Sequence, residues 1–179
     1  MKTEYEAKVL EIDVDDVKKL LESHGAKFVG RFEQKRYVYN TVPVHPGKWV
    51  RLRSNGNKTT LCFKSIESNA IGGTKEIEFT VPDFEQAHQF LEAIGICNKS
   101  YQENIRTSYV LDGVEIDIDE WPMIPAYLEI EGASEQAVHD MVEKLGLGHH
   151  QVTGASVTDI YKMYGFDLND LDKMKVVKF

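Results

Sequence analysis

The apolar and polar positions of the chain repeat one pattern three times. Each time, a short run of alternating apolar and polar residues is followed by a longer run in which apolar residues recur every three or four positions. Alternation is typical of a half-buried strand, and the longer spacing is typical of an amphipathic helix. The sequence therefore predicts strands at 4–9, 76–81 and 127–131, followed by helices at 13–25, 83–95 and 134–146.

Both ends of each predicted helix carry residues suited to that place. Asp13, Asp83 and Ser134 stand at the starts, where a side-chain oxygen can accept hydrogen bonds from free backbone N–H groups. Each helix ends at a glycine, which adopts the left-handed conformation past the last turn. The three units are unequally spaced, which argues against a solenoid of fixed period.

Five further segments have the pattern of strands and are separated by glycine, proline and asparagine. Asn55-Gly56 and Asp112-Gly113 are typical of tight hairpin turns, because these residues tolerate positive φ. Together with the three strands above, the total is about eight, mostly linked by hairpins and hence antiparallel. The further strands are predicted at 27–40, 47–54, 58–66, 98–111 and 113–119.

Length and charge restrict the class of protein. A chain of 179 residues with 42% apolar residues can build one sizeable domain, and no domain boundary is visible. The net charge of −8 disfavours binding to nucleic acid. The charged N-terminus and the lack of a long apolar run predict neither a signal peptide nor a membrane span, so we expect a cytoplasmic protein. The spacing of cysteine and histidine does not indicate a zinc site, and no phosphate-binding P-loop motif is present.

Carboxylates gather on one face of several predicted strands. Residues i and i+2 of a strand point to the same side, so Glu4, Glu6 and Lys8 share a face. Such a face most often meets solvent. However, like charges side by side destabilise a sheet, and a divalent cation such as Mg²⁺ or Mn²⁺ would balance them. The pairs on one face are Glu4 and Glu6, Glu76 and Glu78, Asp117 and Asp119, and Glu129 and Glu131.

A second set of strand positions is cationic and consists of Lys8, Arg51, Arg53, Lys64 and Arg106. If eight antiparallel strands close into a barrel with the charged face inward, the interior carries acids for a metal and bases for a polyanion. A metal-chelated polyphosphate would match both sets. Helices on the outside would then cover the apolar faces of the strands.

The motif Glu4-x-Glu6-x-Lys8 resembles the ExExK signature of the CYTH superfamily, the triphosphate tunnel metalloenzymes. The chain looks most similar to the short bacterial branch of class IV adenylyl cyclase-like and thiamine triphosphatase-like proteins. The resemblance implies an α+β fold, with a closed eight-stranded antiparallel barrel and helices packed outside. It implies one tunnel domain over 1–165. The chain turns polar and charged after that, which predicts a C-terminal tail or lid over 166–179. The later matching elements are Arg51-Leu52-Arg53, Lys64, Glu76-x-Glu78, Arg106, Asp117-x-Asp119 and Glu129-x-Glu131.

The resemblance also implies a role for each charged residue. Mg²⁺ or Mn²⁺ would be held by Glu4, Glu6, Asp119, Glu129 and Glu131. Phosphate groups would be held by Lys8, Arg51, Arg53, Lys64 and Arg106. The candidate catalytic residues are Lys8, Asp117, Glu76 and Glu78, of which the acids would orient the nucleophile or brace the cations.

Two positions depart from the pattern of the cyclases. Those proteins carry lysine where this chain has Asn104, and many relatives carry aspartate where it has Arg36. A missing cation disfavours cyclisation, although Lys35 or Arg36 could compensate. We therefore expect metal-dependent hydrolysis of an inorganic, nucleoside or thiamine triphosphate.

Three alternatives stay open. The first is an adenylyl cyclase that converts ATP to cyclic AMP and pyrophosphate. The second is a non-catalytic binding module for metal-polyphosphate or nucleotide, and the third is an unrelated barrel with a solvated acidic face. The expected partner is a small triphosphate, with neither nucleic acid nor membrane, and analogy to the family allows a homodimer.

Overall fold

The computed structural model describes the backbone of residues 1–179 and the side chains of residues 1–170 and 173–179. Most of the chain forms strands, and the helices are short. The strands are β1 (Lys2–Val9), β2 (Lys27–Asn40), β3 (Lys48–Ser54), β4 (Thr59–Ile66), β5 (Thr74–Val81), β6 (Asn98–Leu111), β7 (Val114–Glu120), β8 (Tyr127–Gly132), β9 (Val152–Thr153) and β10 (Val176–Val177). The helices are α1 (Val14–Ser23), α2 (Phe84–Ala93), α3 (Glu135–Lys144), α4 (Val157–Met163) and α5 (Leu171–Met174).

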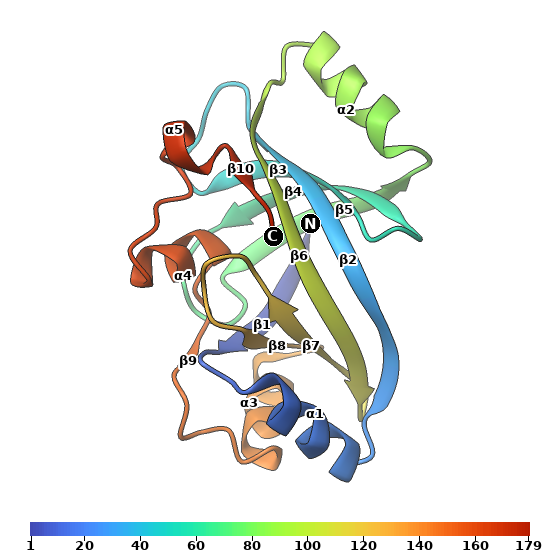
Figure 1. The fold of residues 1–179 in the computed structure, drawn as a ribbon, viewed down its shortest axis with the longest axis vertical. Coiled ribbons are helices and arrows are strands. Elements are labelled where there is room, and N and C mark those ends of the chain that lie inside the picture. The colour runs from blue at the N-terminus through green and yellow to red at the C-terminus, as the bar shows by residue number, and fades with distance from the viewer.

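Eight of these strands close into a ring. They follow each other in the order β6, β2, β3, β4, β5, β1, β8 and β7, and β7 pairs again with β6. All eight pairings in the ring are antiparallel. The predicted closed barrel is therefore confirmed. In Figure 1, the two longest strands, β2 and β6, lie side by side along the long axis of the molecule.

The three predicted units of a strand followed by a helix are present. Asp13, Asp83 and Ser134 each accept a hydrogen bond from the backbone N–H three residues later, as expected of N-cap residues. Figure 1 shows α1 and α3 together at one end of the molecule and α2 at the other. These three helices therefore lie outside the barrel, whose interior is lined mostly by strand side chains and at one place by Val157 and Thr158 of α4.

Alternation along the strands separates an apolar outer face from a charged interior. On β1, the side chains of Ala7 and Val9 are fully buried in a cluster that also contains Leu21 of α1 and Val138 of α3. The neighbouring positions carry the charged residues of the ExExK motif. On β1, burial of the apolar face against helices thus directs the charged face inward, whereas the outward Ile77 and Phe79 of β5 stay exposed and are not covered by a helix.

The C-terminal segment, predicted as a tail or lid, packs against the barrel. Strand β10 pairs in parallel with β6, and Val177 is 1% exposed. Leu168 and Val177 belong to a buried cluster with Trp121 and Tyr161. Tyr161 also donates a hydrogen bond to the carbonyl of Pro122 at 2.7 Å. This segment therefore forms part of the wall at one end of the barrel, and its action as a lid stays a prediction.

In the described part of the chain, the helices are too short or too polar to cross a lipid bilayer.

Candidate active site

The barrel interior contains a cavity of about 340 Å³. Its wall is mostly charged, because the inward positions of the strands carry lysine, arginine and glutamate. Most of the predicted site residues line this cavity. They are Glu4, Glu6, Lys8, Arg51, Arg53, Lys64, Glu76, Glu78, Arg106, Glu129 and Glu131.

Two predicted site residues lie elsewhere. Asp117 lines a neighbouring cavity of about 300 Å³, which shares four residues with the first: Arg53, Glu78, Arg106 and Glu115. Asp119 is fully buried and lines neither cavity. Its carboxylate instead accepts hydrogen bonds from the guanidinium of Arg106, at 2.9 Å from Nε to Oδ1. In this structure Asp119 holds the arginine that faces the cavity.

Sheet register places acids opposite bases at several positions of the ring, although Glu6 and Glu131 also lie opposite each other. On β1 and β8, Lys8 lies opposite Glu129, and on β4 and β5, Lys64 lies opposite Glu76. Residues that are directly opposite in an antiparallel pair have side chains close enough to interact. The register therefore brings charged residues of neighbouring strands into ion pairs, as for Lys8 with Glu129 and Lys64 with Glu76.

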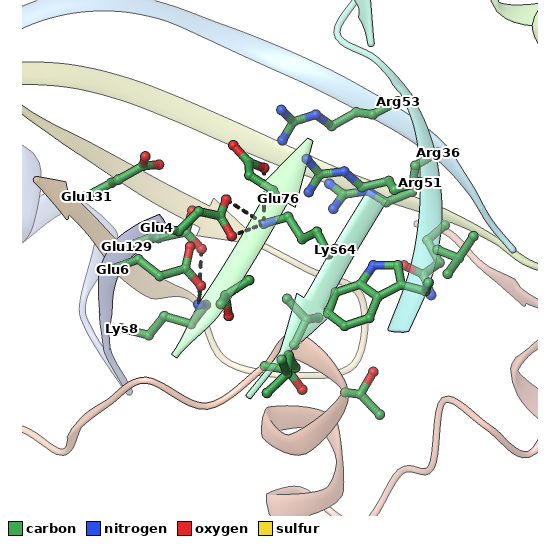
Figure 2. A pocket seen from close by; sticks show the side chains of 18 of the residues that line it. Glu4, Glu6, Lys8, Arg36, Arg51, Arg53, Lys64, Glu76, Glu129 and Glu131 are labelled. Atoms are coloured by element: carbon green, nitrogen blue, oxygen red, sulfur yellow. Dashed lines mark hydrogen bonds and ion pairs between the residues drawn. The ribbon is translucent and has the colours of Figure 1, made fainter. Parts of the chain in front are cut away.

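The carboxylates of β1 and β8 each contact a lysine or arginine. Both oxygens of Glu4 accept hydrogen bonds from Lys64 Nζ at 2.7 Å. Glu6 accepts from Lys8 Nζ at 2.6 Å, and the same nitrogen lies 3.4 Å from Glu129 Oε2. Figure 2 shows these acids on one side of the cavity, with Lys64 of β4 reaching Glu4 across the intervening β5. These carboxylates form the anionic side of the cavity, and Lys8 and Lys64 are already paired with them.

Arg106 is the centre of a second network, on β6, β7 and β8. Its Nη1 donates to Asp117 at 2.6 Å, and its Nη2 donates to Glu129 at 2.9 Å and also to Asp119. Burial alone would lower the pKa of Arg106, but the carboxylates of Asp119, Glu129 and Asp117 raise it well above its ordinary value. The guanidinium is therefore held charged and in one orientation.

The arginines of β3 lie on the other side of the cavity. Arg51 Nη2 lies 3.1 Å from Glu78 Oε2, and Arg53 Nη2 lies 3.6 Å from the same oxygen. Arg51 and burial together lower the pKa of Arg53 to about 10. Figure 2 shows both arginines beside Arg36, so that three guanidinium groups gather on one wall.

Burial changes the titration of several acids in the cavity walls. It raises the pKa of Glu4 to about 7, with Glu6 and Glu76 adding to the effect and Lys64 opposing it. It raises the pKa of Asp117 to about 6, against the attraction of Arg106. Glu129 behaves in the opposite way: Arg106 and Lys8 outweigh burial and hold its pKa well below the usual range.

Three potential metal ligands lie closest together on β4 and β5. One ligand atom each of Cys62, Glu76 and Glu78 lies within 4.8 Å of the other two. Cys62 is a free, buried thiol whose Sγ lies 3.3 Å from Glu76 Oε2, and burial raises the pKa of this thiol to about 12. Such a thiol stays protonated at neutral pH, so only the two carboxylates can serve as hard ligands.

Sequence reasoning noted Arg36 but did not place it in the site. Arg36 lies on β2 and lines the cavity. Trp49 of β3 and Trp121, which lies between β7 and β8, also line it. The signal was present, because Gln34, Arg36 and Val38 alternate with outward residues. Alternation alone, however, does not show which face of β2 points inward.

The fold and the interior define a closed barrel with a charged tunnel. The chain belongs to the CYTH domain family, whose characteristic pattern matches residues 2–164. No curated protein matches the chain.

Three solved structures share the fold. A conserved hypothetical protein from Pyrococcus furiosus is 25% identical, with a TM-score of 0.76, and the match covers 88% of this chain and 99% of that one. A candidate adenylate cyclase from Vibrio parahaemolyticus is 15% identical, with a TM-score of 0.72 and coverage of 90% and 98%. A Hippeastrum protein is 16% identical, with a TM-score of 0.65 and coverage of 96% and 99%. It is described as a candidate adenylyl cyclase that reveals a dominant triphosphatase activity.

Proposed function

We propose that this protein is a divalent-metal-dependent phosphohydrolase that acts on a triphosphate inside the barrel. The observation that carries the proposal is one cavity whose wall holds both sets of charges. Cations for phosphate come from β1, β3, β4 and β6, and carboxylates for a metal come from β1 and β8. A triphosphate chelated to a divalent cation presents the two complementary sets of groups.

The donor set fits Mg²⁺ or Mn²⁺. Glu4, Glu6, Glu129 and Glu131 offer carboxylate oxygens, which are the ligands that hard divalent cations prefer. Burial raises the pKa of Glu4 to about 7, with Glu6 and Glu76 adding to the effect, so a metal bound beside this carboxylate would stabilise its ionised form. A metal bound there would add positive charge near the phosphate oxygens and increase the acidity of a bound water.

The chain's own residues would position the phosphates and transfer the proton. Arg51, Arg53 and Arg106 would donate paired N–H groups to phosphate oxygens, and Lys8 and Lys64 would add point charges. In hydrolysis, water forms a bond to the terminal phosphorus while the bond to the bridging oxygen breaks. Orthophosphate and diphosphate result. Of the candidate acids, Glu76 and Glu78 line the cavity and would accept the proton of the water, whereas Asp117 lines the neighbouring cavity and would orient Arg106.

Adenylate cyclisation is the second candidate. The observation that favours it is that Trp49 and Trp121 both line the cavity, since indole rings can hold a nucleobase by stacking. In that reaction the ribose 3′-hydroxyl would attack the α-phosphorus, and pyrophosphate would leave. Hydrolysis is preferred because Asn104 adds no cation to the interior. In addition, the Hippeastrum protein of the same fold has a dominant triphosphatase activity.

One assay separates these candidates. Purified protein is incubated with inorganic triphosphate, ATP or thiamine triphosphate and with Mg²⁺ or Mn²⁺, and orthophosphate, pyrophosphate and cyclic AMP are measured. We expect orthophosphate, and no product in excess EDTA. Cyclic AMP with pyrophosphate would favour the cyclase, and binding without any product would favour a non-catalytic module. Full turnover in EDTA would contradict the metal dependence.

A further inference from the structure

Arg36 differs from the other arginines of the tunnel in having no acidic partner among the described residues. Arg51 and Arg53 each pair with Glu78, and Arg106 pairs with Asp117, Asp119 and Glu129. The guanidinium of Arg36 instead donates from Nη2 to two amide oxygens, at 2.9 Å to Gln34 and at close range to Asn104. Its carbon Cζ lies 4.6 Å from the centre of the Trp121 ring.

This arginine is also deeply buried. Its side chain lines the cavity, although the residue is only 6% exposed, and its Nε is buried without a hydrogen-bond partner. Neutral amides and an indole face orient the guanidinium but do not neutralise it. Buried charges in proteins are normally paired, because an unpaired one loses its hydration without compensation.

The neighbours of Arg36 increase this cost. Burial lowers its pKa well below the ordinary value, and the positive charges of Arg51, Arg53 and Arg106 lower it further. The carboxylate of Asp119 opposes this effect, but it is already engaged by Arg106. The ligand-free tunnel therefore holds an excess of positive charge at this point, and an anion from outside would relieve it.

We propose that Arg36 is a phosphate-binding residue of this tunnel. Gln34, Asn104 and Trp121 orient it, and it extends the cationic wall of Arg51 and Arg53 toward the end of the cavity that Trp121 lines. The inference rests on the proposed function, because the anion is taken to be the triphosphate. Among the described residues its guanidinium donates only from Nη2, so N–H groups remain that suit the oxygens of a phosphate group. Asn104, which adds no charge of its own, contributes to binding through Arg36.

The test compares Arg36→Gln with a matched control on the same strand. Arg31 also lies on β2, but its side chain is 51% exposed and pairs with Glu33, so Arg31→Gln is the control. Binding of inorganic triphosphate is measured by calorimetry in EDTA, where turnover does not interfere. We expect Arg36→Gln to weaken binding by about 10- to 100-fold, the loss typical of a charged hydrogen bond. Arg31→Gln should keep the affinity of the wild type.

A second readout separates ligand binding from a structural role. Removing an uncompensated buried charge should leave the melting temperature of the ligand-free protein unchanged or higher, and should reduce the increase that triphosphate causes. Arg36→Lys, which keeps the charge, should bind more tightly than Arg36→Gln. A lower melting temperature with wild-type affinity in Arg36→Gln would overturn the proposal, as would equal affinities of the Lys and Gln variants.

The control Arg51→Gln distinguishes a failure of the proposed function from a failure of the role proposed for Arg36. If the wild type neither binds triphosphate in EDTA nor releases orthophosphate with Mg²⁺ or Mn²⁺, the proposed function itself fails. If the wild type binds, Arg51→Gln binds weakly and Arg36→Gln binds normally, only the role of Arg36 is wrong.

Discussion

At the scale of single residues, the tunnel is organised by the partners that each charge finds. Glu129 lies between Lys8 and Arg106, which hold its pKa low, so it remains ionised. For Glu4, the effect of burial exceeds the attraction of Lys64, and the pKa rises. The sequence assigned both glutamates the same role, because both stand in an alternating acidic pair. Their different proton affinities follow from contacts between strands that the pattern does not contain.

Glu129→Gln should reduce phosphate release from triphosphate by at least about a hundredfold, because it removes an ionised group that both orients Arg106 and is placed to bind the metal. The measurement is kcat with saturating Mn²⁺. Glu6→Gln should have a similar effect. The exposed Glu33, whose side chain is 83% exposed, provides the control Glu33→Gln, which should retain full activity. Unchanged activity in both tunnel variants would contradict the site.

Glu4→Gln should change how the stability of the metal-free protein depends on pH. The pKa of Glu4 rises from an ordinary value of 4.5 to about 7 on folding, so the folded protein binds this proton more tightly than the unfolded chain. The wild type therefore loses stability from this group as the pH rises from 4.5 to 7, and the glutamine variant does not.

Urea unfolding in EDTA measures this difference. Relative to the wild type, Glu4→Gln should gain stability on the order of 1–3 kcal/mol between pH 5 and pH 8. Glu33→Gln serves again as the control, with no pH-dependent difference expected. Parallel curves for the wild type and Glu4→Gln would show that the carboxyl titrates normally.

At the scale of elements, the fold relies on short segments that close the ends of the barrel. Three helices begin at capping residues that were predictable from the sequence. The C-terminal strand β10 was not predicted, because two residues are too few to show alternation. Its pairing with β6 buries Val177 in the same cluster as Trp121, which lines the cavity.

Val177→Asp should therefore destabilise the protein by about 3 kcal/mol, because it places an unpaired carboxylate at a position that is 1% exposed. The adjacent Val176 is 53% exposed, so Val176→Asp is a matched control with an expected effect below about 0.5 kcal/mol. Both values come from urea unfolding. If the two variants lose the same stability, β10 does not dock as described.

At the scale of the whole molecule, ring closure concentrates charge in a space from which water is partly excluded. An overall net charge of −8 is compatible with binding a polyanion, because lysines and arginines face the interior. The electrostatic balance of the interior thus differs from that of the whole chain. Bound metal and bound phosphate would each neutralise a different part of it.

Mg²⁺ or Mn²⁺ should raise the melting temperature by several degrees, because a ligand that binds only the folded state stabilises it. The shift should be larger at pH 8 than at pH 6, since protons compete for the carboxylates. Potassium chloride at the same ionic strength is the control for screening. Equal shifts with the salt control would contradict a specific metal site.

The sequence by itself determined the strand and helix units, the caps and the charged residues, because each is encoded by neighbours within a few positions. The resemblance to the CYTH superfamily added the closed barrel, which the structure confirms. Only the tertiary structure decided which acid meets which base, that Asp119 supports Arg106 away from the cavity, and that Arg36 enters the tunnel. These facts depend on register between strands distant in sequence. Periodicity reports the face on which a residue lies but not its partner across the barrel.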